Sequence, residues 1–588
     1  MFKYLTLAWH PADASGSLCA SHLKECLARA PDIWRCVLEH DGVLAYCTGE
    51  RPAAAHAHLL SDRTGVVFGT LFRRDDTAVT ELGQTRLDAA DSRAIASSAG
   101  RILTQRYWGR YVAVLRDSAT SRIRVLRDPC GGLPCWQTRH GNVWIYFSCA
   151  TDCIQLGLAP FSIDWDRVGT RIVSPAQTAQ HRSALQNVDE VQPGECVEVD
   201  GADVKRERYW QAATIARSNV IEDPLPAADA LRTTARACVH AWASCYEHIL
   251  HRLSGGLDSS IVMSCLAEAP SRASLVALNG YLPESDGDER AYARLAARRA
   301  GCTLIEHEID VTRVRLERLL MMTPGACPDS AFSWLVGEQI ETRLIAERGM
   351  ICGGFSGGGG DQVFYSGRAY LAAVDRWQRY GLRRGLLDTM LDAARLDHVS
   401  FWSVLGSIAR SLFHLRRSRL PPGKAWHAYL LSFPQPFYNP LGRIDDPESV
   451  FPLASQPLIE LCLRIPAYVM LHHGQNRGLA RLAFRRDLPR EILVRQSKGG
   501  AEHYGSAVFV SNLKFLRELL LDGMLIGKGL LDKDAMEWTL SGKAHGTRAS
   551  GVGAIFDYAS LEAWVRAWSR LRQRAGGTLE PRRLGPGN

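Results

Sequence analysis

A glycine-rich loop within HILHRLSGGLDSSIV, residues 248–262, constrains the fold of this chain more than any other segment. Apolar residues stand on both sides of it, which predicts a strand, a tight turn and then a helix. A helix N-terminus with no side chains in the way exposes backbone N–H groups and the positive end of the helix dipole, a site that suits phosphate. Ser254, Ser259 and Ser260 add hydroxyl groups, and the Asp258 carboxylate could hold Mg²⁺ against phosphate oxygens. The loop lacks the spacing and the lysine of a Walker A motif, so we do not expect it to present a γ-phosphate for transfer.

Short apolar runs and helical segments alternate after this loop. The runs at 273–282 and 303–309, with a helical pattern between them, predict a β-α-β-α-β order and therefore a parallel sheet covered by helices. Residues 350–364, MICGGFSGGGGDQVF, predict a further strand and a second glycine-rich loop. An isolated glycine pair is usually just a turn, but ligands of open parallel sheets bind where such loops leave the strands.

The first part of the chain has a different pattern of predicted secondary structure. Short strand-like pieces broken by turns recur at 65–75, 110–117, 122–132 and 142–150, which predicts a β-rich domain with few long helices. A polar stretch at 216–226 indicates a linker between domains. We therefore expect two domains, at 1–215 and 227–588.

Composition excludes several classes of protein. The net charge of +8, from 70 basic and 62 acidic residues among 588, is too mild to argue for nucleic acid, although it suits a phosphate-bearing substrate. None of the 16 cysteines forms a CxxC pair, which argues against a zinc ribbon or redox motif. No signal peptide and no run of about twenty apolar residues is evident, so we expect a cytoplasmic protein that does not contact a membrane.

The motifs resemble those of the asparagine synthetase and β-lactam synthetase superfamily. LSGGLDSS (253–260) is similar to the pyrophosphate loop of that superfamily, and SGGGGDQVF (356–364) is similar to its second acidic loop. RDPCGGLP (127–134) and VQPGECVEV (191–199) resemble its N-terminal glutaminase domain. LPREILVRQSKGG (488–500) resembles the segment that carries a catalytic lysine. The resemblance implies an α+β, Ntn-hydrolase-like N-terminal domain followed by an α/β ATP-pyrophosphatase domain with a parallel sheet and extra helices.

The same resemblance implies ATP and Mg²⁺ as cofactors and a reaction through an acyl-adenylate. Its catalytic residues would be Lys498, Asp258 and Asp361, and the two aspartates would hold the metal. The residues implied in ATP binding are Leu253, Ser254, Gly255, Gly256, Leu257, Asp258, Ser259, Leu278, Ser356 and Gly357. On composition alone Lys498 would be one solvated lysine among many, and the flanking SKGG favours the catalytic role.

Two departures from the family pattern select a branch. A working glutaminase of this family needs an N-terminal Cys, and this sequence reads Met1-Phe2-Lys3, so we expect an inactive glutaminase-like domain. Three residues before the metal aspartate, asparagine synthetases have Glu and β-lactam synthetase has Tyr, whereas this chain has Gly358. We expect a cavity at Gly358 that suits a larger substrate. These features, with 451–466 and 495–506, resemble lasso peptide macrolactam synthetases most.

That branch activates an Asp or Glu side chain of a precursor peptide and closes it onto the peptide's N-terminal amine. It implies a leader-free core peptide as substrate, and a leader peptidase and a leader-recognition protein as partners. Three alternatives stay open: an amide ligase acting on a small molecule, a non-catalytic scaffold, and a tRNA-modifying ATP pyrophosphatase, which would need a CxxC pair or a strongly basic face.

The basic, aromatic segment 376–420 could dock a peptide or partner, although a solvated helix face is the commoner interpretation. His472-His473 could bind a metal, but a solvated loop fits better because no third ligand is placed.

Overall fold

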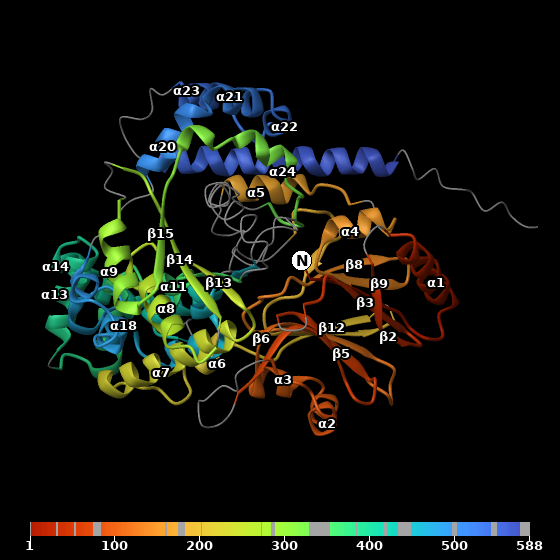
Figure 1. Cartoon of the computed structure of the whole chain (residues 1–588), viewed down its shortest axis with the longest axis horizontal. Helices are drawn as coiled ribbons and strands as arrows, with labels where there is room; N and C mark the ends of the chain where they lie inside the picture. Colours follow the sequence, from red (N-terminus) through yellow and green to blue (C-terminus); the bar gives the residue numbers. More distant parts are fainter. Residues whose placement is uncertain are drawn as a thin grey trace, which may run out of the picture.

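A parallel sheet forms the centre of the C-terminal half in this computed structural model (Figure 1). The structure describes residues 2–576 except 31–32, 52–53, 75–83, 159–160, 174–182, 202, 272, 284–287, 329–352, 384, 415–419, 433–447, 497–501 and 542–549. The sheet has five strands in the order β15-β14-β13-β16-β17, and every pairing is parallel. The strands are β13 (His248–Arg252), β14 (Ser274–Tyr281), β15 (Thr303–Glu308), β16 (Gly353–Ser356) and β17 (Glu448–Val450). The expected α/β unit with a parallel sheet is confirmed.

Helix α8 (Leu257–Ala267) follows β13 and lies between α7 (Pro224–Ala243) and α9 (Arg290–Ala300). Almost all of its residues are buried because it packs on these helices and on the sheet, as an apolar helix inside a domain must. Asp223 begins α7 by accepting a hydrogen bond from the Leu225 backbone N–H, with Pro224 in the first turn. This packing fixes the N-terminus of α8, and with it the first glycine-rich loop.

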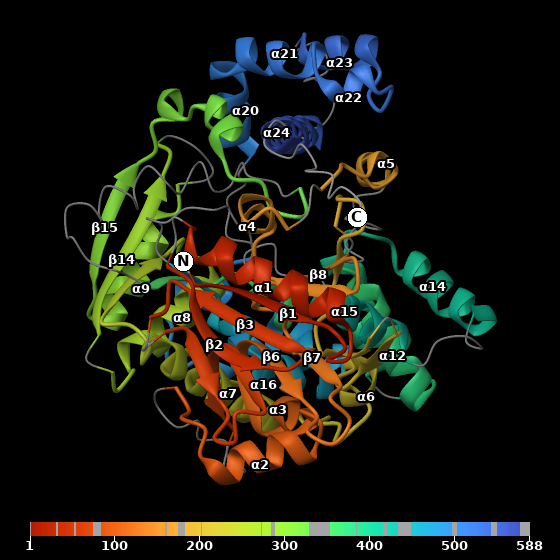
Figure 2. The same cartoon turned by 90° about the vertical axis from the view of Figure 1, so that its right-hand side faces the viewer.

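The N-terminal domain consists of two stacked antiparallel sheets of six strands each. The first has the order β10 (Asp189–Glu190), β8 (Trp136–His140), β9 (Val143–Phe147), β1 (Lys3–Ala8), β3 (Val43–Thr48) and β2 (Arg35–His40). The second has the order β12 (Asp203–Arg208), β11 (Glu195–Asp200), β7 (Ile123–Arg127), β6 (Tyr107–Arg116), β5 (Gly65–Arg73) and β4 (His56–Leu59). Helix α1 (Ala14–Ala28) covers the first sheet, and α2 (Ala89–Ser97) and α3 (Arg101–Arg106) cover the second (Figure 2).

One cluster of buried apolar residues joins the two halves. Phe72 and Trp108 of the second sheet meet Trp242 of α7, with ring centroids 5.1 and 6.1 Å from that of Trp242. The N-terminal domain therefore packs on the parallel-sheet domain through buried aromatic rings, and the two halves form a continuous body.

The remaining helices pack around the parallel sheet or against the N-terminal domain, and α20 to α24 lie above both halves (Figure 1). They are α4 (Ala150–Gln155), α5 (Trp165–Val173), α6 (Ala212–Ile215), α11 (Gly360–Val363), α12 (Ala369–Tyr380), α13 (Leu386–Leu396), α14 (Phe401–His414), α15 (Pro422–Ser432), α16 (Gln456–Arg464), α17 (Ala467–Met470), α18 (Gly478–Ala483), α19 (Arg490–Val494), α20 (Glu502–Ser511), α21 (Leu513–Leu521), α22 (Met524–Gly527), α23 (Lys533–Leu540) and α24 (Ser550–Gly576). Short 3₁₀ turns are η1 (Val311–Arg313), η2 (Leu316–Met321), η4 (Pro452–Ala454) and η5 (His472–Gly474).

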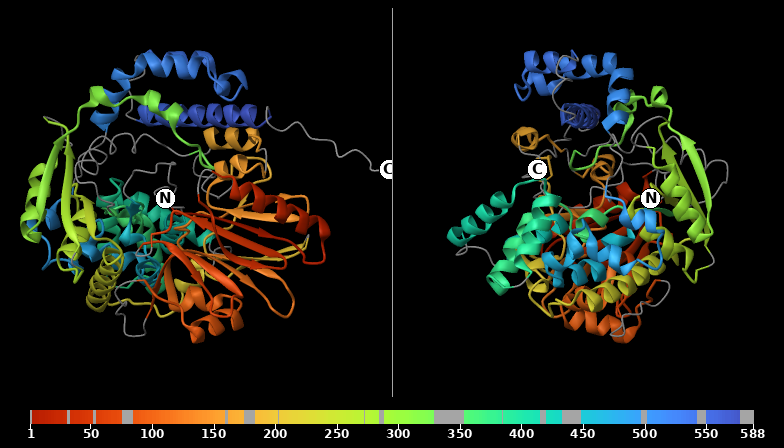
Figure 3. Two further views of the ribbon diagram at one scale, coloured as in Figure 1. Left: turned by 45° about the vertical axis from the view of Figure 1, so that its right-hand side comes forward. Right: turned by 90° about the vertical axis from the view of Figure 1, so that its left-hand side faces the viewer.

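Helix α24 crosses above both halves and contacts α20, η2 and α4 (Figures 1 and 3). Its Trp564 and Trp568 join the core of the first N-terminal sheet with Phe147 and Phe161. In the part of the chain that the structure describes, no helix is both long enough and apolar enough to cross a membrane.

Candidate active site

The two glycine-rich loops leave neighbouring strands at the carboxyl edge of the parallel sheet. β13 ends at Arg252 and β16 at Ser356, and these two residues are register partners. The chain continues from β13 to β14 on one side, and β16 lies on the other side. A crevice for a ligand opens at such a switch in strand order. We call residues 253–259 the first loop and 356–361 the second loop.

The first loop needs its glycines. Gly255 has φ +78°, and a Cβ on it would lie 2.6 Å from the Ala293 backbone nitrogen of α9. Gly256 occupies the N-cap position of α8 and contributes no side-chain cap. The Ser254 hydroxyl oxygen accepts from the Gly256 N–H at 3.3 Å and lies 3.0 Å from the Ser259 hydroxyl oxygen. The result is a helix N-terminus flanked by two hydroxyl groups, which suits a phosphate.

The second loop lies in contact with the first, and glycine permits this approach. A Cβ on Gly357 would lie 2.4 Å from the Ser259 backbone nitrogen. A Cβ on Gly360 would lie 2.4 Å from Cγ of Asp258. Any side chain at either position would therefore force the loops apart and separate Asp258 from Asp361.

Arg477 joins the two carboxylates. Its Nη1 lies 2.7 Å from Oδ2 of Asp258 and 2.9 Å from Oδ1 of Asp361. The Asp258 and Arg477 side chains are about nine-tenths buried, whereas the Asp361 side chain is 51% exposed. Sequence reasoning missed Arg477, which is 219 and 116 residues away from these partners along the chain. The sequence Asn476-Arg477-Gly478 does indicate a turn, and Arg477 has φ +58° there, but no pattern places that turn at the loops.

The donor set fits Mg²⁺ next to a phosphate. Both carboxylates reach one positive group, Nη1 of Arg477, so one cation can contact both. Among the described residues, no group of three or more His, Cys, Asp or Glu gathers as a metal site. Mg²⁺ is commonly held by one or two carboxylates, with substrate phosphates and water completing its coordination.

Replacing Arg477 with methionine tests whether its charge holds the two carboxylates together. Arg477→Met keeps most of the stem but leaves two adjacent carboxylates to repel each other. We expect the unfolding free energy of the ligand-free protein to fall by about 1–2 kcal/mol, a value limited by the exposure of Asp361. Mg²⁺ without ATP should then raise the melting temperature more in the variant than in the wild type. Equal stability and an equal response to Mg²⁺ would contradict this. Arg29→Met, at the C-cap arginine of α1 whose side chain is 79% exposed, is the control.

A buried histidine supports the first loop from beneath. Nε2 of His251 lies 2.9 Å from the Ser259 carbonyl oxygen, and complete burial lowers the pKa of His251 to about 4. On the strand side, the Asn279 side-chain amide donates to the Leu253 carbonyl at 2.7 Å. The first loop therefore rests on uncharged donors at neutral pH.

The lowered pKa of His251 predicts a pH dependence of stability. Between pH 6.5 and about 4 the folded ring stays neutral while the unfolded ring takes up a proton, so stability present above pH 6.5 is lost as the pH falls. We expect His251 to account for a loss of about 2 kcal/mol between pH 7 and pH 5. His251→Gln keeps a donor for the Ser259 carbonyl but cannot titrate. Urea unfolding of both proteins at the two pH values should show a smaller loss in the variant, and identical losses would rule out the assignment.

The other residues expected to bind ATP surround the two loops. Leu253 is buried and donates its N–H to the Leu278 carbonyl of β14 at 2.8 Å. The Ser356 hydroxyl oxygen accepts from the Gly358 N–H at 3.1 Å. Leu257 starts α8 and is buried, and Gly357 touches Ser259. The structure thus gathers the predicted ATP residues at the carboxyl edge of β13, β14 and β16, while their roles stay predictions.

The space expected beside Gly358 is filled, which corrects the expectation of an open cavity there. A Cβ on Gly358 would lie 2.4 and 2.7 Å from Cδ1 and Cε1 of Phe451. Phe451 follows β17 and is buried. Gly358 therefore makes room for the ring of another residue rather than for a larger substrate. An apolar ring stands where an acid or a phenol would otherwise project.

Lys498 lies outside the described residues, but the segment before it is anchored beside the first loop. The Arg481 guanidinium donates to the backbone carbonyls of Leu493 and Arg495 at 2.5 and 2.8 Å. Arg495 pairs with Glu289 and lies over the Tyr292 ring, 4.1 Å from its centroid. The Tyr292 Cβ also lies next to Gly255 of the first loop. Arg495, and Gln496 after it, therefore lie close to the first loop.

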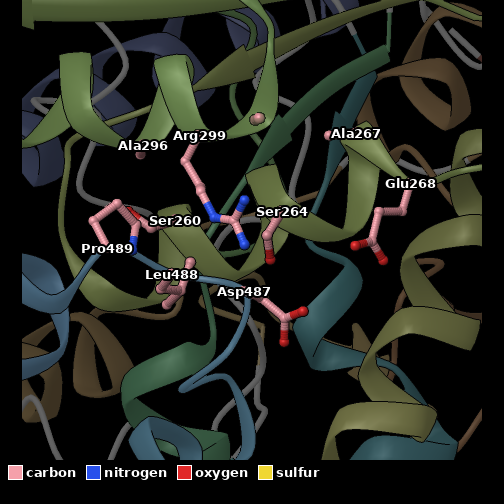
Figure 4. A pocket seen from close by; sticks show the side chains of 10 residues that line it. Ser260, Ser264, Ala267, Glu268, Ala296, Arg299, Asp487, Leu488 and Pro489 are labelled. Carbon is pink, nitrogen blue, oxygen red and sulfur yellow. The ribbon is translucent and has the colours of Figure 1, made fainter.

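A separate pocket lies behind α8, away from the two loops. Figure 4 shows the Arg299 side chain reaching from α9 toward Ser260 and Ser264 of α8, with Asp487 on the opposite wall. Asp487 is already paired with Arg232 at 2.6 Å. Neither the two loop aspartates nor Arg477 lines this pocket, so it is distinct from the candidate active site. Ser260, whose hydroxyl was expected at the first loop, is buried and lines this pocket instead, which corrects that expectation.

Comparison with known proteins identifies the family. The family model for asparagine synthase matches residues 231–424 and 447–566, more than half of the chain and both glycine-rich loops. The chain belongs to the asparagine synthase family. Members of the asparagine synthase family are amide ligases that use ATP, generally with Mg²⁺. No curated protein sequence matches the chain.

Two solved structures show weaker likenesses to this asparagine synthase family member. The allosteric regulatory enzyme of purine biosynthesis is 10% identical, covers 52% of this chain and 80% of its own, and has a TM-score of 0.22. Glutamine phosphoribosylpyrophosphate amidotransferase from B. subtilis, in complex with ADP and GMP, is 11% identical, covers 60% of this chain and 74% of its own, and has a TM-score of 0.21. Likenesses of this size carry no argument about activity.

Proposed function

We propose that the chain is an ATP-dependent, AMP-forming amide ligase. The convergence of Asp258 and Asp361 on Arg477, at the N-terminus of α8, carries this proposal. A carboxylate is a poor electrophile at neutral pH, and transfer of AMP to it supplies a good leaving group. In this reaction the carboxylate oxygen bonds to the α-phosphorus and pyrophosphate leaves. The amine then bonds to the acyl carbon, AMP leaves, and the nitrogen releases a proton.

The residues of the site match the charges that this reaction develops. The backbone N–H groups at the start of α8 and the hydroxyls of Ser254 and Ser259 would bind the departing pyrophosphate. Mg²⁺, when bound, would neutralise charge on the phosphate oxygens. Asp258 and Asp361 would hold it there, and Arg477 would shift from the carboxylates to the phosphate oxygens when ATP enters. Lys498 would stabilise the adenylate or the tetrahedral intermediate.

For the substrate, we propose a precursor peptide that closes into a macrolactam. The amine would be the N-terminus of the peptide, whose pKa near 7.7–8.0 leaves it partly neutral at pH 7, so it needs positioning more than a base. The apolar Phe451 ring beside Gly358 is consistent with a site that offers no acid or phenol at this point. A leader-free core peptide, a leader peptidase, a leader-recognition protein and a cytoplasmic location belong to the same proposal.

Product analysis tests this function. The protein would be incubated with ATP, Mg²⁺ and leader-free peptides that carry Asp or Glu at successive positions. One peptide should lose the mass of one water while equal amounts of AMP and pyrophosphate appear. Amide formation on a small carboxylate with ammonia instead would favour an asparagine synthetase-like or β-lactam synthetase-like ligase. Peptide binding without AMP release would favour a non-catalytic scaffold.

The source of the amide nitrogen also distinguishes a peptide cyclase from a glutamine-dependent ligase. We propose that the N-terminal domain has no glutaminase activity, so the purified protein given glutamine should release no glutamate above a blank. The same result is expected with ATP and peptide present, since the amine belongs to the substrate. Glutamate released in proportion to product would contradict this proposal.

A further inference from the structure

We infer that the N-terminal domain builds part of the amide-ligase site, and that Arg110 is the positioning residue through which it holds the second loop. The inference rests on the proposed function. It concerns residues 448–460, which we call the interface segment. This segment contacts the N-terminal domain on one side and the second loop on the other, and it includes the start of FPLASQPLIELCLRIP (451–466).

Arg110 reaches from β6 to the edge strand of the parallel sheet. Its Nη2 lies 2.6 Å from Oε1 of Glu448, and its Nη1 donates to the Ser449 carbonyl at 3.2 Å. The guanidinium also lies over the Trp242 ring, 4.7 Å from its centroid. The Arg110 side chain is only 12% exposed, so its charge depends on these partners.

The N-terminal motif RDPCGGLP makes room for this contact. A Cβ on Gly132 would lie 2.2 Å from Cγ of Arg110, so a side chain at position 132 would displace the arginine stem. Asp128 of the same motif accepts from the Gly132 N–H at 3.1 Å and from the Cys130 N–H at 2.9 Å, which fixes the turn. A motif that resembles a glutaminase segment therefore supports a contact with the ligase half.

The interface segment also contacts β16 and the second loop, so it connects Arg110 to that loop. Glu448 and Ser449 are register partners of Gly353 and Gly354 in β16, the strand that leads into the second loop. Immediately afterwards, the Phe451 ring occupies the space beside Gly358. A Cβ on Gly359 would lie 3.1 Å from Cβ of Ala454. Movement of β17 would therefore shift the backbone two residues before Asp361.

The far end of the interface segment is held by the same domain. Arg74 lies 2.8 Å from Oε2 of Glu460, and the indole N–H of Trp210 donates to Oε1 of Glu460 at 2.8 Å. The Gln456 side-chain amide donates to the Thr104 carbonyl at 2.8 Å. Because Glu460 is buried, these partners are needed to keep its charge in place. The N-terminal domain thus holds both ends of a segment whose middle shapes the second loop.

Substitutions at Arg110 test the inference. Arg110→Met should lower kcat for amide formation by roughly tenfold, because small displacements of reacting groups are costly. Arg110→Lys should recover most of this loss, since an ammonium still pairs with Glu448. Hydrogen exchange should become faster at residues 353–361 in Arg110→Met. Arg124→Met is the matched control, because Arg124 on neighbouring β7 is 17% exposed and pairs with Glu198 at 2.7 Å, inside the N-terminal domain.

Two results would overturn the inference. One is a kcat of Arg110→Met within twofold of the wild type. The other is faster exchange throughout the N-terminal domain with no change at 353–361, which would indicate a role in domain stability alone. If the wild-type protein forms no amide, the proposed function fails instead, and the exchange experiment still decides whether Arg110 holds the second loop.

Discussion

Asp258→Asn and Asp361→Asn are each expected to lower the rate of amide formation by about two to three orders of magnitude. Both carboxylates contact one guanidinium nitrogen, so both can contact one cation placed against the phosphates. Asparagine preserves the shape but removes the negative charge that the cation needs. Loss of an electrostatic contact that acts in the transition state commonly costs this much. The measurement is the initial rate of AMP release with saturating ATP and peptide.

The control for this prediction separates chemistry from folding. Asp532→Asn replaces an aspartate that caps α23, where asparagine can also cap, and its rate should match the wild type. Both loop variants should keep their circular dichroism spectra because Arg477 retains one carboxylate partner. A near wild-type rate in either loop variant would remove that aspartate from the metal site.

Lys498→Ala is expected to abolish most product formation while ATP still binds. An ammonium close to the adenylate or the collapsing intermediate would contribute on the order of 3–4 kcal/mol of transition-state stabilisation. ATP binding should persist because the first loop and both aspartates remain. Lys498→Arg should also fail, since a planar guanidinium does not replace a compact ammonium. Peptide cyclisation followed by mass spectrometry, beside an ATP-binding assay on the same variants, measures both effects.

The expected control is Lys514→Ala, which removes a lysine that is 92% exposed on α21. Its rate should equal that of the wild type. Normal cyclisation by Lys498→Ala would exclude Lys498 from the mechanism. Loss of ATP binding in Lys498→Ala would instead assign Lys498 to ground-state binding.

The local features of the site could be predicted from sequence because they depend on neighbours in the chain. Glycines at 255–256 and 357–360 mark the turns, and the apolar runs before them mark the strands. The β-α-β-α-β order then places both loops at one edge of the sheet, because parallel strands share their carboxyl ends. A shared edge does not fix which strands are neighbours, so the pairing of Asp258 with Asp361 was implied only by the resemblance of both loops to those of the superfamily.

The features that escaped prediction depend on contacts between distant segments. Arg477 immediately precedes α18, which packs on α7, and no spacing in the sequence indicates this packing. The prediction of a cavity at Gly358 was wrong, because Phe451, 93 residues later in the sequence, fills that space. The contact between Arg110 and Glu448 spans 338 residues. The spacing of residues in the sequence indicates the periodicity of a helix or strand. It does not indicate which distant side chain fills the space beside a glycine.

An isotope experiment tests the central claim most directly. The side-chain carboxylate of the peptide would be labelled with ¹⁸O and the peptide incubated with ATP, Mg²⁺ and the protein. If the carboxylate oxygen bonds to the α-phosphorus, one ¹⁸O should appear in AMP for each amide formed, and none in pyrophosphate. Label in inorganic phosphate, or amide formation with unlabelled AMP, would contradict activation through an acyl-adenylate.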